Sequence, residues 1–275
     1  LYRVHDGPTP EKVELLRQYL RALGLGLSVS DEPRPEEFQA ISAATHERPD
    51  HEQVHTMLLR SMSQAIYSPI NDGHFGLAYE AYTHFTSPIR RYPDLLTHRV
   101  IKAILQGRPY HLPELPEPGD AHEQMGKRLA ARQQRLGRVP APGSKTQGRA
   151  KKGHAELQDW EAAGLHCSAN ERRADEASRD VQAWLKCQYM KQFLGEEFSG
   201  KVTAVTSFGL FVTLDQVYVE GLIHITELGG EYFRFDEARQ ELRGERTGTR
   251  YGIGTQVQIQ VVRVDADARK IDFVL

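Results

Sequence analysis

Arg90, Asp94 and His98 follow one another at intervals of four residues. An arginine guanidinium is planar and permanently charged, so it can pair with two phosphate oxygens at once. A carboxylate four residues later can hold such a guanidinium in place, although an ordinary salt bridge on a helix surface has the same spacing. Arg91 has the same chemistry, and it can instead pair with an acidic residue or a backbone carbonyl. The stretch therefore offers groups suited to binding a phosphate.

The element that carries these groups is expected to begin at Ser87-Pro88, because proline is favoured in the first turn of a helix. An apolar stripe with a helical period follows, formed by Ile89, Tyr92, Leu96, Val100, Ala103 and Ile104. Pro93, however, disfavours a helical residue before it. The segment is either one helix, with Arg90 and Asp94 on a shared face, or a turn followed by a helix, which loosens that relationship.

Three further helices are predicted before this segment. The first begins at Thr9-Pro10 and ends at Gly24, the second follows Pro35, and the third starts near Asp50. The apolar side of the third is expected to hold Val54, Leu58, Ala65 and Ile66. Prolines and glycines between residues 67 and 86 indicate a loop or an irregular strand.

The rest of the chain changes character twice. Residues 108–153 are rich in proline, glycine and charge, which is typical of an insertion or linker, and Asp159–Phe193 reads as a long helix. Beyond residue 195 apolar and polar residues alternate between glycines, which predicts the strands of a small barrel. Asp265 and Asp267 fall between two of these strands and fit a hairpin turn better than a metal site.

Composition describes a soluble globular protein of 275 residues, 39% hydrophobic and 26% charged. The net charge of −2 hides a block between Gly126 and Gly153 with nine basic residues and no acidic one. Such a block is either a solvated flexible segment or an electrostatic footprint for a phosphate backbone. Its basic residues are Lys127, Arg128, Arg132, Arg135, Arg138, Lys145, Arg149, Lys151 and Lys152.

Two cysteines, Cys167 and Cys187, are too few for a disulfide framework, so we expect reduced thiols and a cytoplasmic location. No apolar run approaches the ~18 residues that a membrane-spanning helix needs, and no membrane contact is expected. The chain opens at Leu1 without a signal-peptide pattern, and its first residues read as the middle of a domain. We therefore expect a fragment of a longer protein that acts as a monomer.

Residues 74–98 read HFGLAYEAYTHFTSPIRRYPDLLTH. This run resembles the signature of the ribonuclease II/R family of processive 3′-to-5′ exoribonucleases at every fixed position. The matching residues are His74, Phe75, Gly76, Leu77, Tyr82, Phe85, Thr86, Ser87, Pro88, Ile89, Arg90, Arg91, Tyr92, Asp94 and His98. The Arg-Arg-Tyr-Pro-Asp-Leu version of the motif favours the R branch of the family.

The resemblance implies that Arg90 contacts the scissile phosphate and stabilises charge in the transition state. It implies supporting roles for Arg91, Asp94, Tyr82 and His74. The stretch Asn170-Glu-Arg-Arg resembles a family helix that lines the RNA channel, where Arg172 and Arg173 would meet phosphates, although charged residues on a long helix are often only solvated. The histidines are interpreted as hydrogen-bonded structural residues or RNA contacts, because their spacing fits no zinc template.

The family hydrolyses RNA with magnesium, which a cluster of four aspartates holds. No such cluster occurs in these 275 residues, where acidic residues form only scattered pairs. We therefore expect no metal ligand in this chain and Mg²⁺ only in the intact enzyme, bound by residues outside it. The chain alone is expected to be inactive.

The last 80 residues carry a second resemblance. Gly200-Lys-Val, Ser207-Phe-Gly-Leu-Phe-Val and Glu220-Gly-Leu-Ile-His-Ile resemble the RNA-binding domain repeated in the largest small-subunit ribosomal protein, a five-stranded OB barrel. That resemblance implies a platform on which unpaired bases stack, formed by Phe208, Phe211 and His224, with Lys201 as a phosphate contact. The alternative is that Phe208 and Phe211 fill the barrel interior. Residues of one parity must face outward, however, and Leu210 and Val212 are the natural interior pair.

Together these features predict an α+β chain. Residues 1–194 would be the mainly helical C-terminal portion of the exoribonuclease catalytic domain, with 108–153 as a basic insertion or linker, and 195–275 a five-stranded OB-fold barrel. The predicted function is part of a metal-dependent 3′-to-5′ exoribonuclease that degrades single-stranded RNA to nucleoside monophosphates, in RNA turnover and quality control. The alternative is a non-catalytic RNA-binding protein derived from the family.

Overall fold

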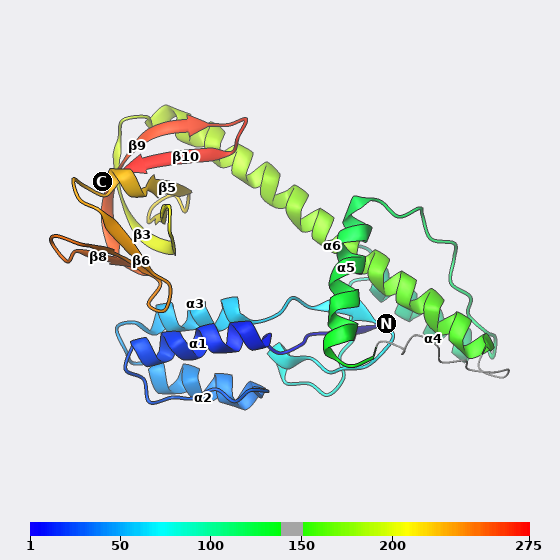
Figure 1. The fold of residues 1–275 in the computed structure, drawn as a ribbon. Helices are drawn as coiled ribbons and strands as arrows, with labels where there is room; N and C mark the ends of the chain where they lie inside the picture. Colours follow the sequence, from blue (N-terminus) through cyan, green and yellow to red (C-terminus); the bar gives the residue numbers. More distant parts are fainter. Residues whose placement is uncertain (139–150) are drawn as a thin grey trace. The chain divides into compact units, whose positions relative to one another are not determined.

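The computed structural model describes residues 1–138 and 151–275, without the side chains of 151–155. The chain divides into two compact units, which are described separately: Leu1–Gly7 with Ser63–Ala177, and Pro8–Met62 with Ser178–Leu275. Helices dominate the chain up to Met190, and a closed five-stranded barrel follows, so the predicted α+β class is confirmed (Figure 1). In the described residues no helix is both long and apolar enough to cross a membrane.

The first unit is built on a short antiparallel pair of strands, β1 (Tyr2–Val4) and β2 (Ile66–Ser68). Its other elements are the 3₁₀ turn η1 (Phe75–Leu77) and the helices α4 (Tyr92–Leu105), α5 (Asp120–Arg135) and α6 (Lys151–Met190), of which α6 continues into the second unit. Helix α6 presses against β2 at Gly164, where a Cβ would lie 2.6 Å from the Tyr67 carbonyl oxygen. The Tyr67 amide donates to Ser168 Oγ at 2.9 Å. Glycine and serine thus let helix and strand meet closely.

Helix α5 lies within residues 108–153, the segment expected to be a basic insertion or linker. Its arginines pair with acidic residues far away in sequence: Arg132 donates to Asp6 at 2.7 and 2.9 Å and to Asp72 at 2.6 Å. Arg135 also donates to Asp6, and Arg138 to Asp72. Proline and glycine around the helix masked its pattern, and much of the basic charge is neutralised within the unit. Lys145 and Arg149, and the side chains of Lys151 and Lys152, lie outside the described residues.

Helix α4 settles the ambiguity over Pro93. The helix begins at Tyr92 and Pro93 occupies its first turn, where the missing N–H costs no hydrogen bond. Residues 87–91 form a turn in front of it, in which the amides of Arg90 and Arg91 donate to the Ser87 carbonyl. The turn-then-helix alternative is therefore the correct one.

The second unit contains the three early helices α1 (Pro10–Ala22), α2 (Pro35–Thr45) and α3 (His51–Ser61). They begin where prolines and Asp50 predicted, and α1 ends before Gly24, whose φ of 69° is left-handed. Ala65 and Ile66 do not belong to the third helix, because it ends at Ser61 and Ile66 opens β2. Helix α3 contacts the barrel: Arg60 donates to the Thr203 carbonyl at 3.0 Å. This contact groups Pro8–Met62 with the barrel rather than with its neighbours in sequence.

The barrel has the strand order β10-β5-β4-β3-β9. Its strands are β3 (Glu197–Thr206), β4 (Gly209–Leu214), β5 (Glu220–His224), β9 (Gln256–Asp265) and β10 (Lys270–Val274), and it follows the short turn η2 (Lys191–Phe193). Leu210, Val212, Ile223 and Val261 are fully buried inside it. The Asp265 carboxylate accepts from the Ala268 amide, so Asp265–Asp267 begin the β9–β10 turn, as predicted.

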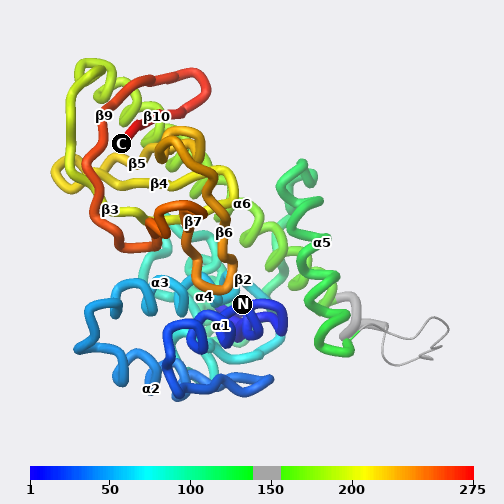
Figure 2. The backbone as a smooth tube through the Cα atoms, turned by 60° about the vertical axis from the view of Figure 1, so that its left-hand side comes forward, coloured from blue at the N-terminus to red at the C-terminus, as the bar shows by residue number. Residues whose placement is uncertain are grey.

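A separate three-stranded sheet between the fifth and ninth strands was missed by the sequence analysis. It consists of β6 (Phe233–Asp236), β7 (Glu241–Gly244) and β8 (Arg250–Gly252) in antiparallel order, preceded by the turn η3 (Ile225–Glu227). Figure 2 shows β6 and β7 running side by side. Strands of three or four residues are too short to display a period of two.

Candidate phosphate and RNA-binding sites

The turn that carries Arg90 is fixed by a buried carboxylate. Asp94 is 0% exposed, and its Oδ1 accepts from the Ser87 amide at 2.7 Å and from the Arg91 guanidinium at 2.8 Å. Burial alone would raise the pKa of Asp94, but the hydrogen bonds from Arg91 and Ser87 outweigh it and hold that pKa below its usual value. Asp94 is therefore ionised and clamps both ends of the turn.

Asp94 does not hold Arg90, which corrects the partnership suggested by their spacing. The helix starts only at Tyr92, so the two residues never share a helix face. Arg91 takes the acidic partner instead, as the alternative for that residue foresaw. Arg90 is exposed on the turn, and within residues 1–138 and 151–275 its guanidinium has no hydrogen bond or ion pair. It keeps its full set of donors for an anionic ligand.

His74 lies in a compact group of rings on the loop before this turn. Its ring centroid is 4.9 Å from that of His5 and 5.3 Å from that of Tyr82, which meets it edge-on. Burial, with His5 nearby, lowers the pKa of His74 to about 4. His5 is tied down on both nitrogens, by the Gly76 amide at 2.8 Å and the Ser63 carbonyl at 2.6 Å. His74 and Tyr82 thus belong to a neutral, packed support for the loop.

The strand pair adds residues that the sequence analysis did not single out. Arg3 stands opposite Tyr67 in the register of β1 and β2, lies 4.6 Å above its ring, and pairs with Glu171 of α6 at 2.8 Å. The Tyr67 hydroxyl is 2.9 Å from His84 Nδ1, and burial, with Arg91 and Arg3 nearby, lowers the pKa of His84. Three-residue strands carry no readable period, so only their pairing could have found this cluster.

The two arginines of α6 differ in availability. Arg172 is used internally: it donates to the Ala65 carbonyl at 2.8 Å and lies within 3.8 Å of both Glu171 and Asp175. Arg173, by contrast, is exposed. Arg173 is therefore the better placed of the two to meet a phosphate.

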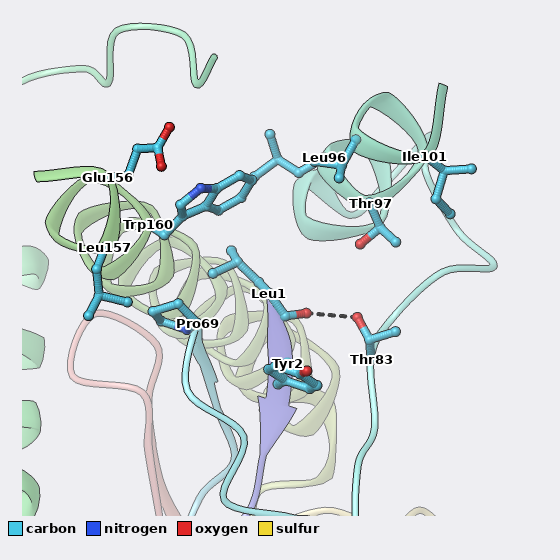
Figure 3. A pocket seen from close by; sticks show the side chains of 11 residues that line it. Leu1, Tyr2, Pro69, Thr83, Leu96, Thr97, Ile101, Glu156, Leu157 and Trp160 are labelled. Carbon is cyan, nitrogen blue, oxygen red and sulfur yellow. Dashed lines mark hydrogen bonds between the residues drawn. The ribbon is translucent and has the colours of Figure 1, made fainter. Parts of the chain in front are cut away.

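A cavity of ≈ 570 Å³ lies between α4, α6 and the start of β1 in the first unit. Figure 3 shows that its walls are mostly apolar, with Leu96 and Ile101 on one side and Leu157 and Trp160 on another. The Thr83 hydroxyl donates to the Leu1 carbonyl at its edge. None of the phosphate-site candidates lines it.

The predicted aromatic platform lies on the barrel surface. Phe208 is 47% exposed and Phe211 is half-buried, with ring centroids 6.1 Å apart and planes at 87°. Leu210 and Val212 fill the interior, so the predicted orientation is confirmed. Gly209 has a φ of 156°, and a Cβ there would lie 2.2 Å from the Ile223 carbonyl. This glycine lets the strand turn sharply enough to present Phe208.

His224 and Lys201 flank the two rings. His224 is exposed opposite Gly209, and its Nδ1 lies 2.8 Å from the Thr226 hydroxyl. Lys201 is already paired, because its Nζ lies 2.8 Å from Glu52 of α3. A phosphate at Lys201 would have to replace that carboxylate.

Magnesium does not fit the residues that the structure describes. Among them, no three histidine, cysteine, aspartate or glutamate side chains gather in a way that could hold a metal ion. Asp6 and Asp72 both approach Arg132, but their carboxylates are already engaged in ion pairs with arginine side chains. No chemical step is therefore assigned to a metal on these residues.

Comparison with known families separates the chain into two matched segments. Residues 1–107 match the RNB domain and residues 191–275 the S1 RNA binding domain. The chain carries RNB and S1 domains. It is 42% identical to ribonuclease R of Escherichia coli and 43% identical to that of Vibrio cholerae, in each case over all of this chain and 30% of the relative.

Solved structures support the same fold. The apo form of Mycoplasma genitalium RNase R superimposes with a TM-score of 0.74 at 24% identity, over 100% of this chain and 37% of that one. A structure of that protein with ribose methylated single-stranded RNA gives a TM-score of 0.70 over the same shares. The chain thus spans about a third of the length of the RNB proteins it matches.

Proposed function

We propose that this chain is part of a processive 3′-to-5′ exoribonuclease of the ribonuclease R type, which hydrolyses single-stranded RNA to nucleoside monophosphates in RNA turnover and quality control. The observation that carries the proposal is the guanidinium of Arg90, which has no partner among the described residues and is presented on a turn that Asp94 clamps from behind. A cation of this kind suits the charge of a phosphoryl transition state. The identity with ribonuclease R over the whole chain supports it.

RNA is the proposed substrate and partner of the chain. Phe208 is exposed on the barrel surface, with the half-buried Phe211 beside it. Stacking of bases on aromatic rings tolerates any sequence, as an enzyme that moves along RNA requires. The solved complex of the Mycoplasma genitalium protein with single-stranded RNA supports this choice. We further propose a monomer that acts in the cytoplasm.

Magnesium would come from outside this chain. Hydrolysis of a phosphodiester uses the metal to activate water and to neutralise charge, and the described residues offer no convergent carboxylates for it. Arg90 can stabilise a phosphate but cannot generate a nucleophile. We therefore propose that the chain alone binds RNA without cutting it.

The test incubates the purified 275-residue chain with 3′-labelled single-stranded RNA and magnesium. Binding without release of mononucleotides is expected. Release of mononucleotides that a chelator abolishes would reveal a metal site in this chain and refute its inactivity.

Arg90 is tested in a protein of the relatives' length that contains this chain. Arg90→Lys is expected to lower kcat by at least ~100-fold, the scale for loss of a positioned charge stabiliser, with a much smaller change in RNA affinity. Arg21→Lys, at an exposed position of α1, is the matched control. If even the unaltered protein binds RNA and never degrades it, the alternative of a non-catalytic RNA-binding protein holds.

A further inference from the structure

Three arginines form a row across the three-stranded sheet β6-β7-β8. The strand register places Arg234 opposite Arg243, and Arg243 opposite Arg250, and all three side chains are exposed. Adjacent strands lie about 4.8 Å apart, so the row extends over roughly 10 Å. Like charges directly opposite each other destabilise a sheet. Three arginines in one row therefore lower the stability of the sheet, which points to a role for them other than stabilisation.

The other face of the same sheet fixes the direction of the row. Phe233 is 3% exposed and Leu242 is fully buried, and Phe233 packs against Tyr251 with ring centroids 5.7 Å apart. Side chains alternate between the two faces of a strand, so burial of Phe233 and Leu242 forces the arginines outward.

The row is only partly neutralised by its surroundings. Asp236 and Glu241 form the next row on the same face, but Arg239 lies 4.0 Å from each of them. Arg250 approaches Glu241 at 3.9 Å. Within the described part of the chain, the guanidinium groups of Arg234 and Arg243 have neither a hydrogen bond nor an ion pair. Both line a depression of ≈ 750 Å³, together with Phe235 and three acidic residues, Asp236, Glu237 and Glu245.

We propose that Arg234, Arg243 and Arg250 form a binding site for the phosphate backbone of RNA, separate from the aromatic platform of Phe208 and Phe211. The inference rests on the proposed RNA-binding function and adds a second contact to it. The strand positions of this face carry arginines and carboxylates, since Phe233, Phe235 and Tyr251 have the opposite parity, and of these rings only Phe235 lines the depression. The row therefore recognises charge and not bases, and guanidinium groups bind phosphate oxygens in pairs.

The salt dependence of RNA binding tests the row. The 275-residue chain is titrated with unstructured single-stranded RNA at several salt concentrations, beside the triple variant Arg234→Gln, Arg243→Gln, Arg250→Gln. Each lost phosphate contact reduces the slope of log K against log salt by about 0.7, so three contacts reduce it by about 2. The thermal midpoint is expected to stay or rise, because like-charge repulsion is removed.

The control removes the same charge elsewhere with Arg21→Gln, Lys102→Gln and Lys191→Gln, three exposed positions whose loss is expected to leave the slope nearly unchanged. An equal fall in both variants would mean that only total charge counts, and it would overturn the site. If the triple variant lacks a cooperative thermal transition, Arg243→Gln alone decides: a slope lower by about 0.7 supports the row, and an unchanged slope overturns it.

Two further outcomes separate this proposal from its rivals. Loss of binding to poly-glutamate in the triple variant, with the RNA slope unchanged, would assign the row to an acidic protein and refute the RNA site. Absence of RNA binding by the unaltered chain would refute the RNA-binding function and the row together, whereas binding with an unaltered slope in the triple variant refutes the row alone.

Discussion

Asp94 accepts a 2.8 Å hydrogen bond from Arg91, the second arginine of the pair, and leaves the first, Arg90, without a carboxylate. The two neighbouring guanidinium groups therefore have opposite environments. Arg91 turns back to the base of the turn, where it and the Ser87 amide share one oxygen of Asp94. Arg90 stands exposed, and no acidic side chain in the described part of the chain pairs with it. One arginine builds the turn, and the other is presented by it.

Asp94→Asn is expected to lower the free energy of unfolding by about 1–3 kcal/mol, because a hydrogen bond between charged groups is weakened while the shape is kept. In a protein of the relatives' length, kcat is expected to fall while KM changes little, since the turn that presents Arg90 loosens. Urea unfolding and steady-state kinetics measure the two effects. If Asp94→Asn combined with Arg90→Lys lowers kcat by the full product of the single effects, the clamp does not act through Arg90.

Phe208→Ala with Phe211→Ala is expected to weaken binding of unstructured RNA by about 1–3 kcal/mol per lost stacked base, with little change in thermal stability. Affinity is measured by titration and stability by thermal unfolding. The contrasting variant is Leu210→Ala, at a fully buried site between them, which is expected to cost about 2–5 kcal/mol of stability. A double variant that unfolds the barrel would show that the two rings are core and not platform.

As the pH falls, the first unit is expected to lose stability before its carboxylates become protonated. The folded pKa of His74 is about 4, below its unfolded value, so the unfolded chain binds protons first. The stability that neutral His74 contributes is complete above about pH 6.5 and is lost as the pH falls towards 4. His84 and His166 act in the same direction, because burial lowers the pKa of each.

His74→Gln should therefore flatten the dependence of unfolding free energy on pH between about 4 and 6.5. Urea unfolding across that range measures it, with His111→Gln, on the exposed segment after α4, as the control. Asp94 and Asp72, whose pKa values are lowered, lose their contributions only at more acidic pH. An unchanged pH profile in His74→Gln would mean that His74 is not held neutral by the fold.

Arg132→Met is expected to destabilise the chain by about 2 kcal/mol, because it leaves the half-buried Asp6 and Asp72 with fewer charged hydrogen bonds. Arg128→Met, on an exposed position of the same helix, should change stability by less than about 0.5 kcal/mol. Thermal or urea unfolding distinguishes them. Equal losses of stability in the two variants would show that α5 is stabilised by helix formation itself and not by the ion pairs of Arg132.

Local signals predicted much of this fold. Prolines at positions 10 and 35 marked two helix starts, and the alternation of Leu210 and Val212 with Phe211 placed the barrel core and its outer face. Local signals did not predict which side chains would pair with each other in the folded chain. The partner of Asp94 depended on where a helix begins, which Pro93 left ambiguous.

Helix α5 shows the same limit in another form. It is held by Asp6 and Asp72, which lie at least 60 residues away from Arg132 and Arg138 in sequence, and its flanks are rich in proline and glycine. Short strands hid the arginine row as well, because only their register brings Arg234, Arg243 and Arg250 into line.

The ion pair between Lys201 and Glu52 lowers the binding free energy that a phosphate can obtain from Lys201. A phosphate that binds Lys201 replaces the carboxylate of Glu52 as the partner of the ammonium group. Lys201 thus has an anionic partner both before and after binding. Little counterion is released in such an exchange, and Lys201 should count for less than one full charge in the salt dependence of binding. If the chain binds RNA as proposed, Glu52 of α3 would therefore compete with every phosphate that reaches Lys201.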